Sequence, residues 1–239
     1  MLDQFQNQIA KAGINPNHRL LLAVSGGVDS MVLWSLIQKG KNPYAVAQMN
    51  FSLRGKESLA DQEMVQKQAE KLGVAYHQKV VDTKNYAEKN KLSIQMAARE
   101  LRYNWFDQLL EQNQYDFLLT AHHLDDAAET FLIHLDRGTG LSGLLGIPSE
   151  GKLIRPMLNF SKAEILTYAK KNQINYREDQ SNASTKYLRN WFRHEIILRW
   201  KKRNPEFLKA MKYTMANLEE AHEFMQFQIE KESNQFKEQ

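Results

Sequence analysis

Residues 20–37 read LLLAVSGGVDSMVLWSLI, and this stretch decides the fold. An apolar run ends at Ser25, two glycines follow, and an amphipathic segment begins at Val28. The apolar run is typical of a buried strand, and the spacing of apolar residues over 28–37 predicts a helix. The stretch therefore predicts a strand, a tight loop and a helix in direct succession.

The same alternation continues along the chain. Strands are predicted at 20–24, 44–49, 74–81, 117–121 and 152–155, and helices at 28–37, 58–72, 92–112, 125–136 and 161–172. Capping boxes are predicted at Asp126–Glu129 and Ser161–Glu164. This order predicts an α/β fold, a doubly wound, mostly parallel sheet covered on both faces. Ligands of such sheets bind outside the carboxyl ends of the strands, where the SGGVDS and AHHLDD segments lie.

Strand patterns end near Ser184, so we expect two domains, 1–184 and a helical extension over 185–239 that is basic at its start. Residues 186–203 hold seven Lys or Arg and one acid, with four aromatic residues between them. Such a segment suits RNA, or it is an amphipathic helix with a solvated basic face and its aromatic residues in the core. Further along, a spacing of three and four residues predicts a long helix with one apolar seam, packed on the domain or on a second copy in a homodimer. The seam residues are Met211, Met215, Leu218, His222, Met225 and Ile229.

The composition is that of a globular protein. Of 239 residues, 42% are hydrophobic and 25% charged, with a net charge of +4. No apolar run reaches the roughly 20 residues of a membrane-spanning helix, and the N-terminus lacks the layout of a secretion signal. Cysteine is absent, which excludes disulfides and thiolate chemistry from these residues. We expect a cytoplasmic protein without a membrane partner.

The SGGVDS loop suits the phosphates of ATP. Gly26 and Gly27 let the backbone approach an oxyanion, and the following helix, from Val28, directs its free N–H groups to the same place. Ser25 and Ser30 offer hydroxyl groups that can donate hydrogen bonds, and the loop also contains one acid, Asp29. A carboxylate repels phosphate, so Asp29 is interpreted as a ligand of Mg²⁺. The alternative is a plain strand-to-helix turn; neither the Walker pattern nor the dinucleotide pattern matches.

In this position SGGVDS resembles the pyrophosphate loop of the N-type ATP pyrophosphatases, which have an adenine nucleotide alpha hydrolase-like fold. Five further stretches resemble the tRNA(Ile)-lysidine synthetase family: ESLADQE near Glu57, AARELRYNWF at 97–106, AHHLDDAAETFLIHLDRGTGLSGLLGI at 121–147, IRPML at 154–158 and REDQSNASTKYLRNWFR at 177–193. The resemblance covers about residues 20–193.

The resemblance implies roles for particular side chains. ATP would be bound by Ser25, Gly26, Gly27, Val28, Asp29, Ser30, His122 and His123, although each histidine could equally be structural. Catalytic groups would be Asp29, Asp125, Asp126, Glu129 and Arg193. We expect Asp125, Asp126 and Glu129 to face the ATP site and to bind Mg²⁺ or the α-amino group of an amino acid, although helix capping alone could explain Asp126 and Glu129. RNA would be bound by Arg102, Arg137, Arg189 and Arg193; Arg99 and Arg102 alternatively form a solvated face. Asp179, Ser181 and Asn182 lie near the target base or form a turn.

The implied reaction makes lysidine. ATP adenylates O2 of the wobble cytidine in isoleucine tRNA with a CAU anticodon, the ε-amine of free lysine attacks C2, and AMP leaves. Ala127 stands where the family has glutamine, and Gln48 and Phe51 replace histidines, although Arg54 is retained. Many members continue into a further tRNA-binding region, so we expect weak binding of whole tRNA or dependence on a dimer.

Three other functions are considered. A tRNA thiolase of the superfamily needs cysteines, which this sequence lacks. A ligase acting on a small molecule, related to NAD synthetase, does not need the aromatic and basic stretch at 186–203. An RNA-binding protein with a relic nucleotide pocket would bind RNA without converting ATP to AMP.

Overall fold

The computed structural model describes residues 1–53, 55–147, 149, 151–177 and 188–237. The chain divides into two compact units, Met1–His122 with Ser149–Asp179, and His123–Pro148 with Gln180–Gln239. The predicted domain boundary between residues 184 and 185 falls outside the described residues. No helix in the described part of the chain has the length and apolar character needed to cross a bilayer.

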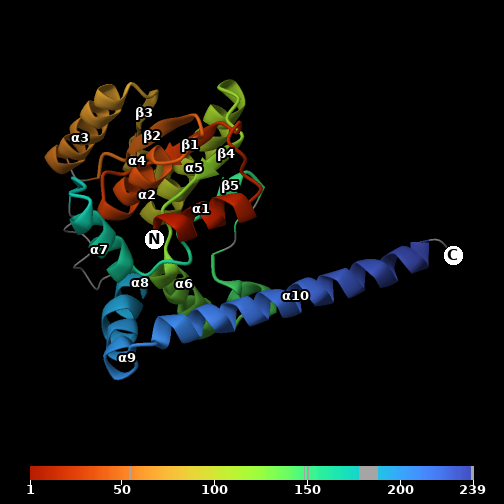
Figure 1. Ribbon diagram of the computed structural model, residues 1–239. Coiled ribbons are helices and arrows are strands. Elements are labelled where there is room, and N and C mark those ends of the chain that lie inside the picture. The colour runs from red at the N-terminus through yellow and green to blue at the C-terminus, as the bar shows by residue number, and fades with distance from the viewer. Residues whose placement is uncertain (54, 148, 150, 178–187, 238–239) are drawn as a thin grey trace. The chain divides into compact units, whose positions relative to one another are not determined.

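The first unit is built on a five-stranded sheet (Figure 1). Its strands are β1 (Leu20–Ala23), β2 (Tyr44–Asn50), β3 (Tyr76–Val80), β4 (Phe117–Leu119) and β5 (Leu153–Ile154). Its helices are α1 (Leu2–Lys11), α2 (Val28–Gln38), α3 (Lys56–Leu72), α4 (Thr83–Lys89), α5 (Ile94–Gln112) and α7 (Lys162–Lys171).

The sheet is parallel throughout, in the order β3-β2-β1-β4-β5. In register, Leu20 of β1 pairs with Tyr44 of β2 on one side and with Phe117 of β4 on the other. The strand order therefore reverses beside β1, and a crevice opens at the carboxyl ends of strands at such a switch point. The predicted doubly wound α/β fold is confirmed.

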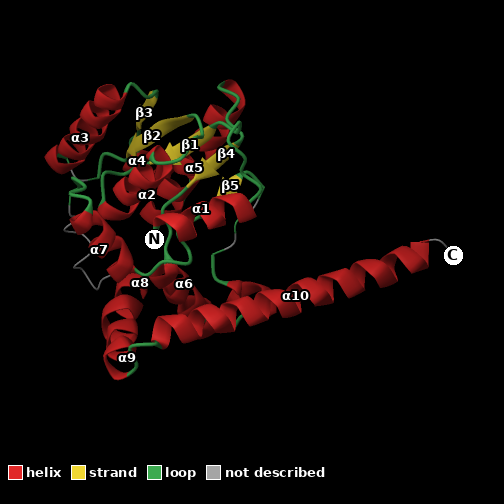
Figure 2. Cartoon of the chain, in the orientation of Figure 1, coloured by secondary structure: helices red, strands yellow, loops and turns green. Residues whose placement is uncertain are grey.

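Helices cover both faces of this sheet (Figure 2). Leu20 and Leu22 belong to a core with residues of α1, α2, α3 and α7, whereas Leu21 packs with Trp105 and Phe106 of α5. Successive residues of a strand face opposite sides, so an unbroken apolar run is what a strand buried on both faces requires.

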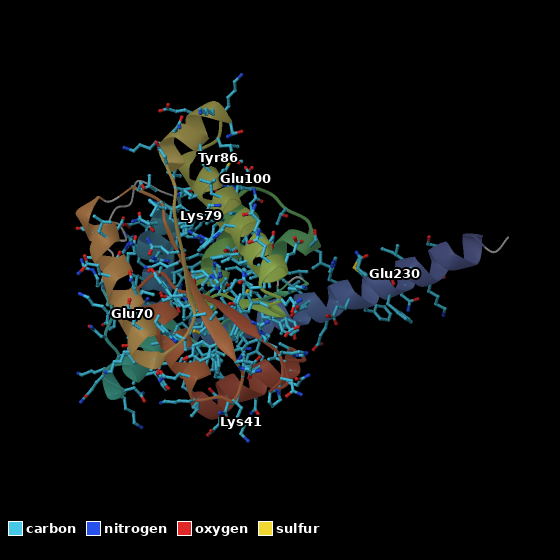
Figure 3. All side chains as sticks on the ribbon, turned by 90° about the horizontal axis from the view of Figure 1, so that it is seen from above. Lys41, Glu70, Lys79, Tyr86, Glu100 and Glu230 are labelled. Carbon is cyan, nitrogen blue, oxygen red and sulfur yellow. The ribbon has the colours of Figure 1, made fainter. Side chains whose placement is uncertain are left out.

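Two helices of this unit were not predicted. One is α1; the other is α4, which precedes α5. The helix predicted over 92–112 begins at Ile94, because the Ser93 side chain accepts a hydrogen bond from the Met96 amide and caps it. Tyr86 of α4 donates to Glu100 of α5 at 2.7 Å, and Figure 3 labels both residues.

The second unit is helical. It contains α6 (Leu124–Asp136), the 3₁₀ segment η1 (Leu141–Leu145), α8 (Leu188–Trp191), the π-helical segment η3 (Phe192–Ile197), α9 (Leu198–Arg203) and α10 (Phe207–Lys237). The predicted seam of α10 is buried at Met211 and Met215, and α10 packs against α6 and η1. Further along, Met225 is 50% and Ile229 57% exposed, so the seam is not buried along its whole length.

The beginning of α6 corrects one sequence prediction. The capping box is formed by His123 and Asp126, not by Asp126 and Glu129, because the helix begins at Leu124 and places Asp126 in its third position. The capping box at Ser161 and Glu164 is present as predicted.

Candidate functional site

The SGGVDS loop (residues 25–30) is held in shape by its own hydroxyl groups. The Ser25 amide donates to the Ser30 hydroxyl at 3.1 Å, and that hydroxyl donates to the Gly27 carbonyl at 2.9 Å. The Ser25 hydroxyl accepts from the Gly27 amide at 3.3 Å. The two serines thus fix the turn, and the first amides of α2, which lack helical partners, are directed at its mouth.

Gly26 is required by both conformation and space. Its φ of +92° lies in a region that side-chain-bearing residues rarely adopt, and an added Cβ would lie 3.3 Å from the Met64 Cε atom of α3. Its carbonyl accepts a hydrogen bond from the Arg177 amide at 3.0 Å. The loop is therefore fixed by α3 and by the chain at Arg177.

A cleft of about 280 Å³ opens beside this loop, within the first unit. It is lined by the loop, by the ends of β1, β2 and β4, and by one side of α5: Ala23, Val24, Ser25, Gly27, Asp29, Ser30, Ala47, Met49, Phe51, Arg102, Tyr103, Phe106, Thr120, Ala121 and His122. Its volume is close to the lower end of the range for small-molecule sites. One end is polar and the other apolar, as a nucleotide with a phosphate chain and a purine requires.

Arg102 brings a positive charge into this cleft. Its guanidinium carbon lies 4.9 Å from the centre of the Phe51 ring. Burial lowers the pKa of Arg102 below its ordinary value, yet a guanidinium remains charged at neutral pH. Arg99 is exposed and lies 4.8 Å from the Tyr103 ring. Of these two arginines, Arg102 is the one placed to meet a bound nucleotide.

Gln48 connects the loop to the sheet. It is buried, and its amide nitrogen donates to the Ser25 carbonyl at 3.4 Å while its carbonyl accepts from Tyr76 at 2.7 Å. Burial raises the pKa of Tyr76 to about 12, so the phenol remains a donor. Gln48 therefore supports the loop backbone.

Asp29 lines the cleft and is held by a lysine distant in sequence. The Lys162 Nζ atom lies 2.6 and 2.8 Å from the two carboxylate oxygens of Asp29. Among the described residues, no group of three or more acids or histidines is arranged to hold a metal ion. Asp29 alone would offer Mg²⁺ a single carboxylate, and the other ligands would have to come from ATP phosphates and water.

His122 and His123 have different surroundings. His122 lines the cleft, and its Nδ1 lies 3.0 Å from the Thr120 hydroxyl. His123 is buried and caps α6 by accepting from the Asp126 amide at 3.3 Å. Only His122 is exposed to the cleft; the geometry of His123 is that of a helix cap.

In the second unit, Glu129 is paired with Arg193. The glutamate side chain is fully buried, and Arg193 donates to its two oxygens at 2.6 and 3.1 Å. Burial raises the pKa of Glu129, and the Arg193 guanidinium opposes that rise. Arg189 lies 3.6 Å from the same carboxylate and donates to the Thr130 hydroxyl at 2.7 Å.

The two other predicted acids of this cluster also have cationic neighbours. Lys201 donates to Asp125 at 2.6 Å, and an Asp126 oxygen lies 3.6 Å from Arg193. Asp125, Asp126 and Glu129 all lie on α6, but the described residues include no group of three or more acids or histidines that could hold a metal ion, so the Mg²⁺ alternative for these three acids finds no support. The structure joins these acids to the basic segment of α8, η3 and α9 in one network.

Other parts of the basic segment are open to solvent. Trp191 is 42% and Trp200 44% exposed, so these aromatic side chains are not core residues, unlike the buried Phe192. Arg137 ends α6 and is exposed. Exposed indole rings among cations are suited to stacking with unpaired bases. Arg54, Asp179, Ser181 and Asn182 lie outside the described residues.

Sequence reasoning missed several groups at the cleft. Met49 ends the predicted second strand and Phe51 comes just after it, so both could have been placed at its carboxyl end. The sequence holds a weaker signal for Lys162. It occupies the first position of α7, where the helix dipole disfavours a cation, so a lysine there is unusual for a residue that serves only the helix.

Comparison with known proteins agrees with this geometry. A family profile described as a PP-loop domain matches residues 1–200. The tRNA(Ile)-lysidine synthase of Porphyromonas gingivalis is 41% identical over 202 residues, 84% of this chain and 44% of that protein. The enzyme of the same name from Thermosipho africanus is 38% identical over 242 residues, 99% of this chain and 56% of that protein. The chain thus spans about half the length of these curated relatives.

A solved structure with the same fold is the U34-tRNA thiolase NcsA from Methanococcus maripaludis with its 4Fe–4S cluster. It superposes with a TM-score of 0.74 at 20% identity, covering 91% of this chain and 76% of that one. Identity at this level shows the fold alone. Together with the profile match over residues 1–200, the loop and its cleft lead to one conclusion: this chain belongs to the PP-loop domain family.

Proposed function

We propose that this chain is an ATP-dependent tRNA-modifying ligase that joins free lysine to C2 of the wobble cytidine of isoleucine tRNA with a CAU anticodon. The observation that carries the proposal is the SGGVDS loop lining a cleft of about 280 Å³ at the carboxyl ends of the strands. The names of the relatives supply the reaction class. tRNA is used in the cytoplasm, which we propose as the compartment.

The first step is adenylation. ATP binds with its outer phosphates against the amides that follow Gly26 and its adenosine among Met49, Phe51 and Phe106. O2 of the cytidine attacks the α-phosphorus, and the bond to pyrophosphate breaks. Mg²⁺, held in part by Asp29, would neutralise charge on the phosphates. Fixed N–H dipoles at the loop stabilise the departing pyrophosphate without reorganising.

The second step is substitution by lysine. The ε-amine of lysine, having lost a proton, attacks C2; the bond from C2 to the adenylated oxygen breaks, and AMP leaves with that oxygen. We assign orientation of the lysine to Asp125 and Asp126, and contact with the anticodon loop to Arg137, Arg189 and the exposed indoles of α8 and α9.

One assay separates this function from its alternatives. The 239-residue chain is incubated with labelled lysine, ATP and an isoleucine tRNA transcript, with UAU in place of CAU as the matched control. Label in the CAU transcript but not in the UAU transcript supports the proposal. Release of AMP without labelled RNA would favour a small-molecule ligase, and RNA binding without AMP would favour a non-catalytic protein. An anticodon stem-loop at high concentration replaces whole tRNA if binding is weak.

A further inference from the structure

The SGGVDS loop carries no basic side chain of its own. Its six residues are two serines, two glycines, a valine and an aspartate. Loops that bind the outer phosphates of a nucleotide commonly pair their amides with a lysine that acts as a point charge. Here the one charged side chain of the loop, Asp29, has the wrong sign for that task.

The structure supplies a lysine from another element. Lys162 is the first residue of α7 and lies 133 residues from Asp29 in sequence, and its Nζ is within 2.8 Å of both Asp29 oxygens. Asp29 lines the cleft and Lys162 does not, so the ammonium is separated from the space that receives the phosphates by the one carboxylate that it contacts.

Stability gives little reason for a lysine at this position. The pair is partly exposed, at 35% for Lys162 and 30% for Asp29, and exposed ion pairs contribute little to folding. The helix dipole further disfavours a cation in the first turn of α7. The α2 and α7 helices pack together, which brings this ammonium to the loop whether or not a ligand is present.

We propose that Lys162 is a phosphate-binding residue: its ammonium contacts the β- and γ-phosphates of ATP and supplies the positive charge that the loop lacks. Before ATP binds, the ammonium neutralises Asp29. When ATP binds, the ammonium is shared between Asp29 and the phosphate oxygens, which reduces the repulsion between the carboxylate and the ligand. This inference rests on the proposed function only in requiring ATP as the ligand.

The role predicts selective loss of affinity. AMP lacks the outer phosphates, so removing the ammonium should weaken the binding of ATP and leave the binding of AMP unchanged. The probe is calorimetric titration of ATP and of AMP into the full chain with EDTA present, which removes any part that Asp29 plays through a metal ion. For K162Q we expect the Kd of ATP to rise at least about tenfold and that of AMP to change less than about twofold.

Two variants serve as controls. K162R restores part of the ATP affinity, because it returns the charge. K170Q removes an exposed lysine from the last turn of the same helix and leaves both Kd values at the wild-type level. Circular dichroism checks that each variant is folded. An ATP Kd for K162Q within about twofold of wild type overturns the inference.

A double-mutant cycle with D29N separates contact of Lys162 with the phosphates from simple neutralisation of Asp29. If Lys162 acted only on the carboxylate, K162Q would have no effect in a D29N background. We expect the same loss of about tenfold in ATP affinity in that background. Failure of the proposed function is read separately. If the chain does not take ATP, wild type and all variants fail to bind it alike; if it uses ATP on another acceptor, the lysine-transfer assay fails while the ATP affinities still follow the pattern expected here.

Discussion

Replacing Arg193 by methionine tests how far the acidic network holds the second unit together. Methionine keeps the aliphatic length of the side chain but removes the guanidinium from Glu129. That glutamate is fully buried and accepts two hydrogen bonds from Arg193, at 2.6 and 3.1 Å. The substitution therefore leaves a buried carboxylate without its main partner.

The expected cost follows from these contacts. Breaking a buried ion pair by removing one partner costs about 3–5 kcal/mol. Arg193 is 30% exposed, and Arg189 remains 3.6 Å from the carboxylate. Both facts reduce the cost, so we expect the free energy of unfolding to fall by about 2–3 kcal/mol at pH 7.

The loss depends on pH with a definite sign. Burial already raises the pKa of Glu129 above its ordinary value of 4.5, and loss of Arg193 raises it further. A carboxyl group whose pKa is raised by folding binds protons more readily in the folded state, so stability falls as the pH rises through that interval. The deficit of R193M is therefore largest at neutral pH and shrinks as the pH approaches 4.5.

Urea unfolding measures this difference. Trp191 and Trp200 lie in the second unit and Trp34 and Trp105 in the first, so fluorescence follows both, and hydrogen exchange in α6 localises the effect. The matched control is E129L/R193M, which replaces the pair with apolar groups and should recover at least about half of the loss. A deficit below about 0.5 kcal/mol at pH 7, or one that grows on acidification, refutes the reasoning.

Three further substitutions follow from the first unit. D29A should abolish release of AMP, and a retained rate would contradict the role assigned to Asp29. The circular dichroism spectrum should be unchanged, because the partly exposed pair with Lys162 contributes only about 0–1 kcal/mol to stability. G26A should raise the Kd of ATP. The φ angle of Gly26 is +92°, and the left-handed region costs a residue with a Cβ atom about 1–2 kcal/mol, so the loop should be distorted. An unchanged Kd in calorimetry would show that the loop tolerates alanine and would contradict this prediction. Y76F should lower the free energy of urea unfolding by about 1 kcal/mol through the lost bond to Gln48. The difference in stability between Y76F and wild type should narrow above pH 10. Folding raises the pKa of Tyr76 to about 12, so the unfolded wild type loses the phenol proton first and the folded wild type is destabilised, whereas Y76F has no phenol to ionise. A difference that does not change with pH would argue against the raised pKa.

The fold was predictable where apolar patterns are long. The run before Ser25 is buried, as expected of a central strand, and the alternation of strands and helices that follows it predicted the α/β class. The helix α1 was missed because only Phe5 and Ile9 of its ten residues are buried, too sparse a pattern to stand out. Within this chain the seam of α10 is buried only at its start, because periodicity records which residues share a face and not which neighbour covers them.

The site was predictable where its parts are adjacent in sequence. SGGVDS contains the whole loop, and α6 contains all three clustered acids. What could not be predicted is which cation meets which acid. Lys162 reaches Asp29 across 133 residues and Arg193 reaches Glu129 across 64, and these pairings depend on helix packing that no local pattern encodes.

The same pairings limit what the acids can do in the proposed reaction. Glu129 has no exposed side-chain surface, whereas Asp126 is 15% and Asp125 11% exposed. An amino group of lysine that binds here must replace a cation already present. At Asp125 that cation is the ammonium of Lys201, so exchange leaves the local charge unchanged, whereas displacing Arg193 would leave Glu129 buried without its partner. Loss of lysine transfer in an Arg193 variant is thus expected from structure alone, and only variants of Asp125 and Lys201 test lysine binding without disturbing the buried pair.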